Sequence, residues 1–234
     1  MSRLIFIETS TSLCSTALAD DGRIICSRRS TEPRAHASMT AVFIKQVLDE
    51  AGWKVSDLDA VAVSAGPGSY TGLRVGASTA KGLCFGAGIP LVSVSTPDIL
   101  ARQAIEAGLP EGCTAILPMI DARRMEVYTA IYSPDGERLG EINPKVLDEN
   151  SFADLFAAGP VAVIGDAADK FKQVRTVSCP TLSPTSVFIQ CCPEATAMLV
   201  PAMRKYEKKE FEDVAYFEPF YLKQFVATVG KKLF

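Results

Sequence analysis

The chain has 234 residues, of which 48% are apolar and 22% are charged, and its net charge is −3. This composition is close to that of ordinary folded domains, which argues against disorder and allows a real hydrophobic core. No apolar run approaches the roughly 18 residues that a membrane-spanning helix needs, and the N-terminal sequence turns polar after Ile7, too early for a signal peptide. We therefore expect a cytoplasmic protein with no membrane contact.

The basic residues are scattered along the sequence. The densest basic run, RKYEKKE at 204–210, is interrupted by glutamates and is typical of the solvated face of a helix. Binding to nucleic acid needs a basic stripe that displaces counterions from phosphates. We therefore expect nucleic acid to reach this chain only through a partner.

The seven cysteines form no CxxC pair and lie mostly in apolar runs. This pattern is typical of small buried side chains in a reducing compartment. A redox or metal role for the adjacent Cys191 and Cys192 is the alternative, although no second pair or nearby histidine completes such a site.

The first thirty residues predict three antiparallel strands, with a tight hairpin turn at Asp21-Gly22. Residues 36–51 place their apolar side chains on one helical face, and Gly52 ends this helix. Residues 58–66 then predict a short buried strand that runs into a glycine-rich turn.

A second helix is predicted over 71–86 and a buried strand over 89–95. The next helix is expected to begin with Thr96 as its N-cap and Pro97 in its first turn. Strands that alternate with helices are typical of a sheet covered by helices.

The pattern starts again after Gly108. Apolar runs at 113–122, 125–133 and 161–166 predict strands, and residues 193–210 predict a helix that is broken near Pro201. A C-terminal segment rich in aromatic residues then predicts an extended tail.

We place a boundary between two lobes near residue 105. Residues 1–105 form the first lobe, residues 106–210 form a smaller α/β lobe, and the tail, 211–234, is expected to return to the first lobe. Two lobes that each open with strands before helices outline a duplicated α/β fold of the actin-like, ribonuclease-H-like kind, with mixed sheets flanked by helices.

The segment SAGPGSYTGLRVGASTAKGL, residues 64–83, resembles the signature of the TsaB family, also called YeaZ. Three further stretches agree with that family in order and spacing, and the tail sequence PFYLK at 219–223 resembles its ending: these stretches are 4–18, 89–101 and 118–132. The resemblance is dense over 1–132 and thin between 140 and 210. Two small departures are Glu8, where aspartate is commoner in the family, and Met125, where glycine is commoner.

The resemblance implies a non-catalytic scaffold subunit of the complex that makes N6-threonylcarbamoyladenosine in tRNA (t6A37). Such a subunit binds and activates its catalytic paralogue TsaD, helps to recruit the ATPase TsaE, needs no cofactor and forms a homodimer in isolation. TsaD holds a metal with two histidines spaced H-x-x-x-H. Thr96 and Leu100 stand at those positions here, so the resemblance implies no metal and no catalytic residue.

Two segments are candidates for phosphate binding. The turn at 66–72 leaves a strand and opens a helix, but it matches neither of the common glycine-rich phosphate motifs and is also explained as a structural turn. The hairpin loop after the first strand resembles the first phosphate loop of actin-like kinases, although serine and threonine are also common in tight turns. The residues of this loop are Glu8, Thr9, Ser10 and Thr11.

Small residues recur every four positions in the helix at 71–86, which allows another element to approach closely. That element belongs either to this chain or to a partner. The resemblance assigns this helix and the helix at 36–51 to the contact with TsaD or with a second copy. The predicted interface residues are His36, Met39, Phe43, Gly72, Gly76 and Ala80.

Four charged residues that follow a predicted strand suggest either a cleft between the lobes or structural salt links. These residues are Asp121, Arg123, Arg124 and Glu126. His36, the one histidine of the chain, is isolated as a general base. Two rival functions therefore stay open: a free-standing actin-like ATPase or kinase, and an M22-type metallopeptidase whose metal pair is missing.

Overall fold

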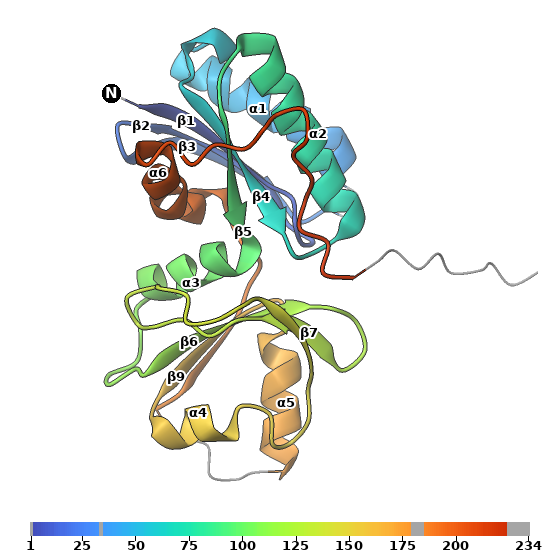
Figure 1. The fold of residues 1–234 in the computed structure, drawn as a ribbon, viewed down its shortest axis with the longest axis vertical. Coiled ribbons are helices and arrows are strands. Elements are labelled where there is room, and N and C mark those ends of the chain that lie inside the picture. The colour runs from blue at the N-terminus through green and yellow to red at the C-terminus, as the bar shows by residue number, and fades with distance from the viewer. Residues whose placement is uncertain (1, 33–34, 179–184, 224–234) are drawn as a thin grey trace, which may run out of the picture.

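The structure is a computed structural model that describes residues 2–32, 35–178 and 185–223. Within these residues the chain forms two lobes, each built on one five-stranded mixed sheet flanked by helices (Figure 1). The predicted α/β class with two lobes is confirmed. In the described part of the chain no helix is both long enough and apolar enough to cross a bilayer.

The first sheet has the strand order β3-β2-β1-β4-β5. Its first three strands are antiparallel neighbours, and β4 and β5 add in parallel beside β1. The predicted hairpin is confirmed, because Asp21 and Gly22 have φ angles of 47° and 76°. The strand bounds are β1 Arg3–Glu8, β2 Cys14–Asp20, β3 Arg23–Ser30, β4 Ala60–Gly66 and β5 Leu91–Ser95.

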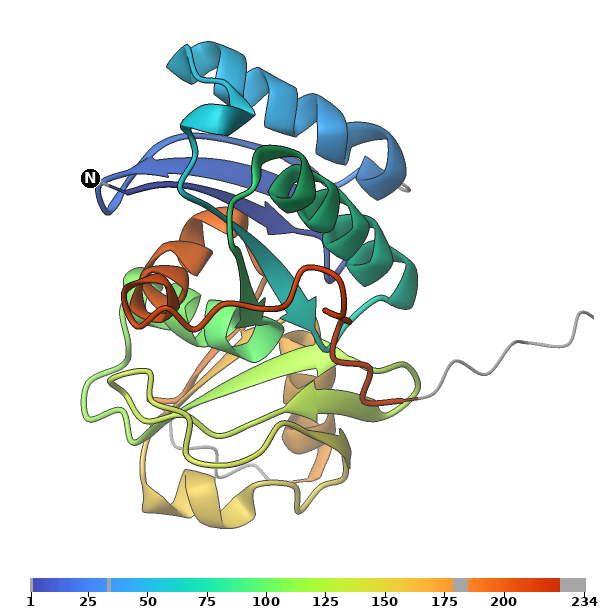
Figure 2. The same ribbon diagram turned by 45° about the horizontal axis from the view of Figure 1, so that its top comes forward.

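Helices cover both faces of the first sheet (Figures 1 and 2). One face packs against α1 and α2 through apolar side chains such as Val47 and Ala80, and the short η1 lies between α1 and β4. The other face packs against η2 and α6 through Met198 and Ala202. The helix bounds are α1 Ala35–Ala51, η1 Val55–Asp57, α2 Tyr70–Ala87, η2 Ala195–Met198 and α6 Leu199–Glu207.

The second sheet has the order β10-β9-β6-β7-β8. Helix α3 covers the face toward the first lobe, and α4 and α5 cover the other face. The sequence did not predict β8, β10, α4 or α5, because their hydrophobic patterns are short or interrupted. The bounds are α3 Thr96–Ala107, β6 Ala115–Asp121, β7 Glu126–Thr129, β8 Asn143–Val146, α4 Ala153–Ala158, β9 Val161–Gly165, α5 Ala168–Ser178 and β10 Val187–Gln190.

Because η2 and α6 pack on the first sheet, we propose a division of the chain that differs from the expected boundary at residue 210. In this division the segment 195–207 belongs to the first lobe, and α3 is the shared layer between the lobes. Ile99 of α3 packs with the first sheet, and Leu100 of the same helix packs with the second.

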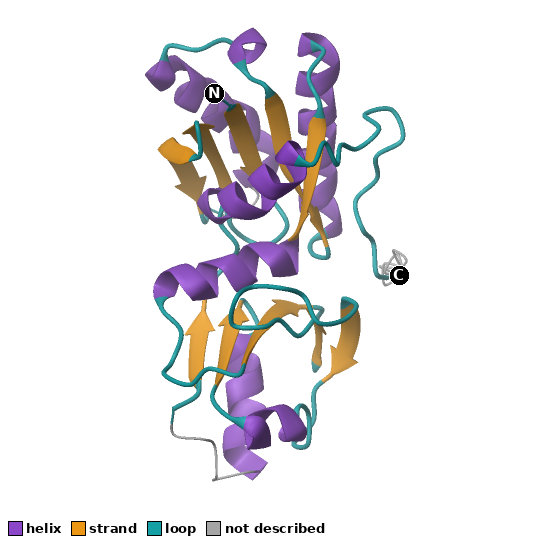
Figure 3. Cartoon of the chain, turned by 60° about the vertical axis from the view of Figure 1, so that its left-hand side comes forward, coloured by secondary structure: helices purple, strands orange, loops and turns teal. Residues whose placement is uncertain are grey.

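The described part of the tail, 211–223, lies along the first lobe (Figure 3). The backbone N–H of Glu212 donates to the carbonyl of Leu91 at 2.9 Å, and Phe217 is buried in the core beside α2. The Nζ of Lys81 donates to the carbonyl of Ala215 at 3.0 Å. Residues 224–234 of the expected tail lie outside the described residues.

One local prediction about a helix start is wrong. The N-cap of α3 is Ser95, whose hydroxyl accepts from the backbone N–H of Asp98 at 3.2 Å, and Thr96 is already helical. The chain around Pro201 is a helical segment broken near that residue, as the sequence predicted. It forms η2 and then α6, and Pro201 lies in the first turn of α6, where a missing N–H leaves no hydrogen bond unmade.

Candidate functional site

A polar cleft of about 790 Å³ lies between the two lobes. Loops at the ends of β1, β4, β6 and β9 form its walls, together with the end of the described tail. The carboxyl ends of parallel strands leave side chains and helix N-termini pointing into such a cleft, which makes it the usual place for a ligand in α/β proteins. Its lining residues are Ser10, Thr11, Ser12, His36, residues 67–71, residues 120–124, Glu126, Tyr128, Asp166 and residues 220–223.

The loop after β1 forms the floor of the cleft. Glu8, Thr9 and Ser10 are fully buried, and Thr11 is 6% exposed. One carboxylate oxygen of Glu8 accepts from the backbone N–H of Ser10, and burial raises the pKa of Glu8 to about 7. Among the described residues, the other carboxylate oxygen and the hydroxyls of Thr9, Ser10 and Thr11 are buried without a hydrogen-bond partner. Such groups are costly to bury unless water or a ligand satisfies them.

The glycine-rich turn and the start of α2 pack directly on this loop. A side chain at Gly68 would collide with the carbonyl oxygen of Ser10, and one at Gly72 would collide with that of Thr9. The hydroxyl of Ser69 caps α2 by accepting from the backbone N–H of Gly72 at 3.3 Å. The turn therefore holds the N-terminus of α2 beside the unsatisfied hydroxyls.

The strip of small residues on α2 faces the inside of the chain. Gly72 and Gly76 are buried against the loop after β1, and Ala80 lies in the core between α2 and the sheet. In this structure the three residues offer almost no surface to a partner, so the close approach that the sequence indicated is made within the chain. An interface on α2 must therefore use its outward face.

The predicted interface residues on α1 also point inward. Phe43 is 5% exposed and packs with Cys14 and Ala35, and the partly buried Met39 joins that cluster. His36 lines the cleft, and its Nε2 is buried without a partner in the described part of the chain. None of these three side chains lies on the outward face of α1.

The outward faces of α1 and α2 carry exposed apolar and small residues among charged ones, such as the exposed Lys45–Asp49 ion pair on α1. Phe85 is 87% exposed and Val42 is 40% exposed. An added Cβ at Gly82 or Gly86 would meet nothing within 4 Å. We call this surface the α1–α2 outer face, defined by Ala37, Ala41, Val42, Ser78, Gly82 and Phe85.

The charged residues from the end of β6 to the start of β7 line the cleft, as one of the two sequence interpretations expected, and two of them are also in salt links. Asp121 pairs with Lys170, and Glu126 pairs with Lys223 of the tail. Arg123 and Arg124 have left-handed φ angles of 70° and 50°, and both side chains line the cleft. The tail thus ties the first lobe to β7 by an ion pair.

Sequence reasoning missed Asp166 at the end of β9. Its carboxylate accepts from the backbone N–H of Asp121 at 2.8 Å, and burial raises its pKa to about 6. The sequence did contain a signal for this residue: Asp121 ends β6 and Asp166 follows β9, and these parallel buried strands end at the same edge of the sheet. It also missed the aromatic wall of the cleft, which includes Tyr70 and Tyr221 with ring centroids 5.0 Å apart.

Thr96 and Leu100, which the resemblance sets against the two histidines of TsaD, do not have the chemistry of a metal site. Thr96 and Leu100 are both fully buried, and Leu100 packs in the apolar cluster between α3 and the second sheet. Within the described ranges, no group of three or more histidine, cysteine, aspartate and glutamate side chains is placed to hold a metal ion.

The fold and the inter-lobe cleft define a two-lobed α/β protein of the actin-like class. The ethanolamine utilization protein EutJ of Carboxydothermus hydrogenoformans shares this fold with a TM-score of 0.52 at 12% identity, over 87% of this chain and 90% of that one. A crystal structure from Pseudomonas aeruginosa, described as similar to peptidase YeaZ, matches with a TM-score of 0.79 at 29% identity, over 95% of this chain and 100% of that one.

The sequence comparisons identify the family to which the chain belongs within this class of fold. The family model described as TsaD, tRNA N6-adenosine threonylcarbamoyltransferase, matches residues 29–230. The tRNA threonylcarbamoyladenosine biosynthesis protein TsaB of Escherichia coli K12 is 31% identical over an alignment that covers 96% of this chain and 96% of that one. The chain therefore belongs to the TsaB family of tRNA threonylcarbamoyladenosine biosynthesis proteins, within the wider TsaD-like family.

Proposed function

We propose that this protein is a non-catalytic scaffold subunit of the assembly that makes threonylcarbamoyladenosine in tRNA. In this role it binds and activates TsaD, helps to recruit TsaE, and meets tRNA only through the complex. Membership of the TsaB family and the match to the TsaD model support this role.

The observation that carries the proposal is the α1–α2 outer face. Phe85 leaves 87% of its surface in water, and burying a phenylalanine side chain stabilises a complex by ~1.5–3 kcal/mol. The small residues beside it, such as Gly82, allow a partner helix to approach closely. We therefore place the contact with TsaD, or with a second copy when TsaD is absent, on this face.

The test is light scattering after gel filtration of the protein mixed with TsaD from the same organism. Phe85→Arg should abolish the heterodimer that the unaltered chain forms. Leu139→Arg is the matched control, because Leu139 is 64% exposed on the second lobe and should leave the complex intact. A variant at Gly76, such as Gly76→Arg, would not test the interface, because its side chain would collide with Thr9 inside the fold.

If the Phe85→Arg variant still forms the complex, the interface with TsaD lies on another surface. No complex with TsaD, with or without nucleotide, would contradict the scaffold role itself. A labelled TsaE that joins the wild-type heterodimer but not TsaD alone would support the recruiting role, and equal binding to both would contradict it.

The non-catalytic part of the proposal rests on side-chain chemistry. Leu100 has no atom that can bind a metal, and it stands where TsaD has its second histidine. Of the carboxylates that line the cleft, Asp121 and Glu126 are each held in an ion pair. Synthesis of the modified base by this chain without TsaD would contradict this part.

One observation favours a second candidate function, the binding of a nucleotide phosphate in the cleft. The unsatisfied hydroxyls of Ser10 and Thr11 lie at the cleft floor, beside the N-terminus of α2. Calorimetric titration with magnesium ATP tests this idea, with the Ser10→Ala, Thr11→Val double variant as comparison. Stoichiometric binding of magnesium ATP by the wild type that the double variant loses would support nucleotide binding. The absence of any heat of binding in the wild type would contradict it.

A further inference from the structure

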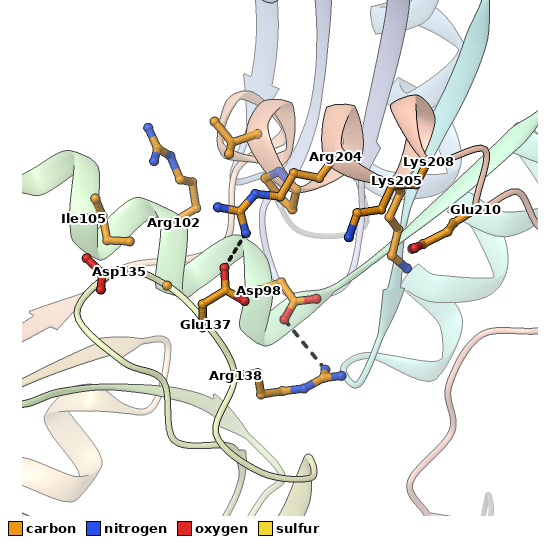
Figure 4. A pocket seen from close by; sticks show the side chains of 13 residues that line it. Asp98, Arg102, Ile105, Asp135, Glu137, Arg138, Arg204, Lys205, Lys208 and Glu210 are labelled. Atoms are coloured by element: carbon orange, nitrogen blue, oxygen red, sulfur yellow. Dashed lines mark hydrogen bonds and ion pairs between the residues drawn. The ribbon is translucent and has the colours of Figure 1, made fainter.

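A second pocket, of about 220 Å³, lies where α3, α6 and the turn at 133–138 meet (Figure 4). Its lining residues differ from those of the cleft. Among the described residues, five cations from three distant segments line it: Arg102, Arg138, Arg204, Lys205 and Lys208. Four carboxylates also line it: Asp98, Asp135, Glu137 and Glu210.

The three arginines are held in place while keeping donors for a ligand. Arg102 pairs with Glu106 at 2.8 Å, Arg204 pairs with Glu137 at 2.8 Å, and Arg138 lies 3.7 Å from Asp98. A guanidinium group has five N–H donors in a fixed fork, and each of these ion pairs is one contact to one nitrogen. The remaining donors can meet a second anion.

The two lysines are at the C-terminal end of α6. The exposed carbonyl groups of a helix C-terminus stabilise cations near them. Lys205 and Lys208 have this position at the edge of the pocket. The Nζ of Lys205 also donates to the hydroxyl of Ser93 at 3.4 Å. Lysine and arginine together provide both a point charge and a planar fork, the combination that suits phosphate groups.

The carboxylates differ in how firmly they are fixed. Asp98 accepts from the hydroxyl of the buried Tyr132 at 2.6 Å, so it belongs to the frame of the pocket. Glu137 has a side chain that is 66% exposed, and it follows Gly136 on a turn. Exposed ion pairs are weak, so a more highly charged anion can replace Glu137 on Arg204. Asp135 and Glu210 oppose ligand binding from the rim.

We propose that this pocket is a phosphate-binding site, in which the carboxylate of Glu137 occupies the place of the ligand when the site is empty. The pocket is smaller than the roughly 300 Å³ at which sites for drug-sized molecules begin, which favours a compact phosphate or diphosphate group over a large organic ligand. A bound phosphate would join α6, on the first sheet, to the turn at 133–138 of the second lobe. We assign the group to a free phosphorylated compound, because we propose that tRNA meets this chain only through the complex.

The test uses the full chain alone, so it is independent of the proposed scaffold role. Calorimetric titration with inorganic pyrophosphate at low salt compares the wild type with two variants of opposite expected effect. Arg204→Gln should weaken binding by roughly tenfold, as expected for the loss of a charge-assisted contact. Glu137→Gln should tighten binding several-fold, because it removes the competing carboxylate. Lys45→Gln, a loss of one exposed charge on α1, is the control and should change neither.

A second arm replaces pyrophosphate with tRNA. Weakening by Arg204→Gln for pyrophosphate but not for tRNA supports a free phosphate compound. Weakening for tRNA, alone or together with pyrophosphate, assigns the site to an RNA backbone and contradicts the proposal that tRNA is met only through the complex. The proposal is overturned if Arg204→Gln has no effect on either, or if Glu137→Gln fails to tighten binding of the ligand that Arg204→Gln weakens. Thermal unfolding of each variant verifies that it is folded.

Discussion

Replacing Gly76 by alanine tests how the strip of small residues on α2 is used. In a helix interior this change stabilises by ~1 kcal/mol when the new methyl group meets nothing. At Gly76 the methyl carbon would lie 2.3 Å from the Oγ1 of Thr9 and 3.4 Å from the Cγ2 of Val63. Thr9 is fully buried and cannot turn into solvent, and overpacking costs ~1–3 kcal/mol. We therefore expect a net loss of up to ~2 kcal/mol of folding free energy, which is the overpacking cost less the helix gain.

Gly82 on the same helix provides the matched control. A Cβ at Gly82 would meet nothing within 4 Å, so Gly82→Ala should stabilise by ~1 kcal/mol. For a chain of this size a change of 1 kcal/mol moves the Tm by ~2–4 °C. The same chemical substitution should therefore lower the Tm at Gly76 and raise it at Gly82, as measured by calorimetry or circular dichroism.

A rise in Tm for Gly76→Ala equal to that for Gly82→Ala would refute this reasoning. It would mean that α2 is not packed tightly against Thr9. The small residues of α2 would then again be candidates for a surface that a partner contacts. Thr9→Ala supplies a further check, because it removes the colliding oxygen. It should destabilise the Gly76→Ala variant less than the wild type, which a double-mutant cycle measures.

Two more predictions concern stability. The pKa of Glu8 is raised from 4.5 to about 7 in the folded protein, so the folded state binds the extra proton between these values and stability falls as pH rises from 4.5 to 7. The loss is on the order of 3 kcal/mol, and Glu8→Gln should remove it; urea unfolding at pH 5 and pH 8 measures this, and an unchanged pH dependence in the variant would contradict it. Phe217→Ala removes the aromatic anchor of the tail from the core beside α2 and should destabilise by up to ~3–5 kcal/mol. It should also speed proteolytic cleavage within the tail, and cleavage at the wild-type rate would show that the tail is held by its backbone contacts instead.

Much of the first lobe was predictable because its signals are local. The hairpin needs a left-handed backbone at Asp21 and Gly22, and aspartate followed by glycine is a sequence that predicts such a turn. Helices α1 and α2 carry apolar side chains at helical spacing, and β4 is a short apolar run between turns. Residues 4–18 and 64–83 also carried the family, which the comparisons confirm.

Local signals failed where the sequence has little periodicity of its own. Strand β8 reads Asn-Pro-Lys-Val with all four residues exposed, so nothing in its pattern marks a buried face. It is a strand because β7 offers hydrogen-bond partners along its edge. Pairing of this kind depends on a neighbour that the sequence does not place.

The sequence by itself determined the order of the main elements, the family, and the close approach that the small residues of α2 require. Only the tertiary structure decided that this approach is made to Thr9, that α6 packs on the first sheet, and that Arg102, Arg138 and Arg204 surround one pocket. The physical reason is that periodicity reports which face of an element is buried, whereas contacts between distant segments depend on how all the buried faces pack together.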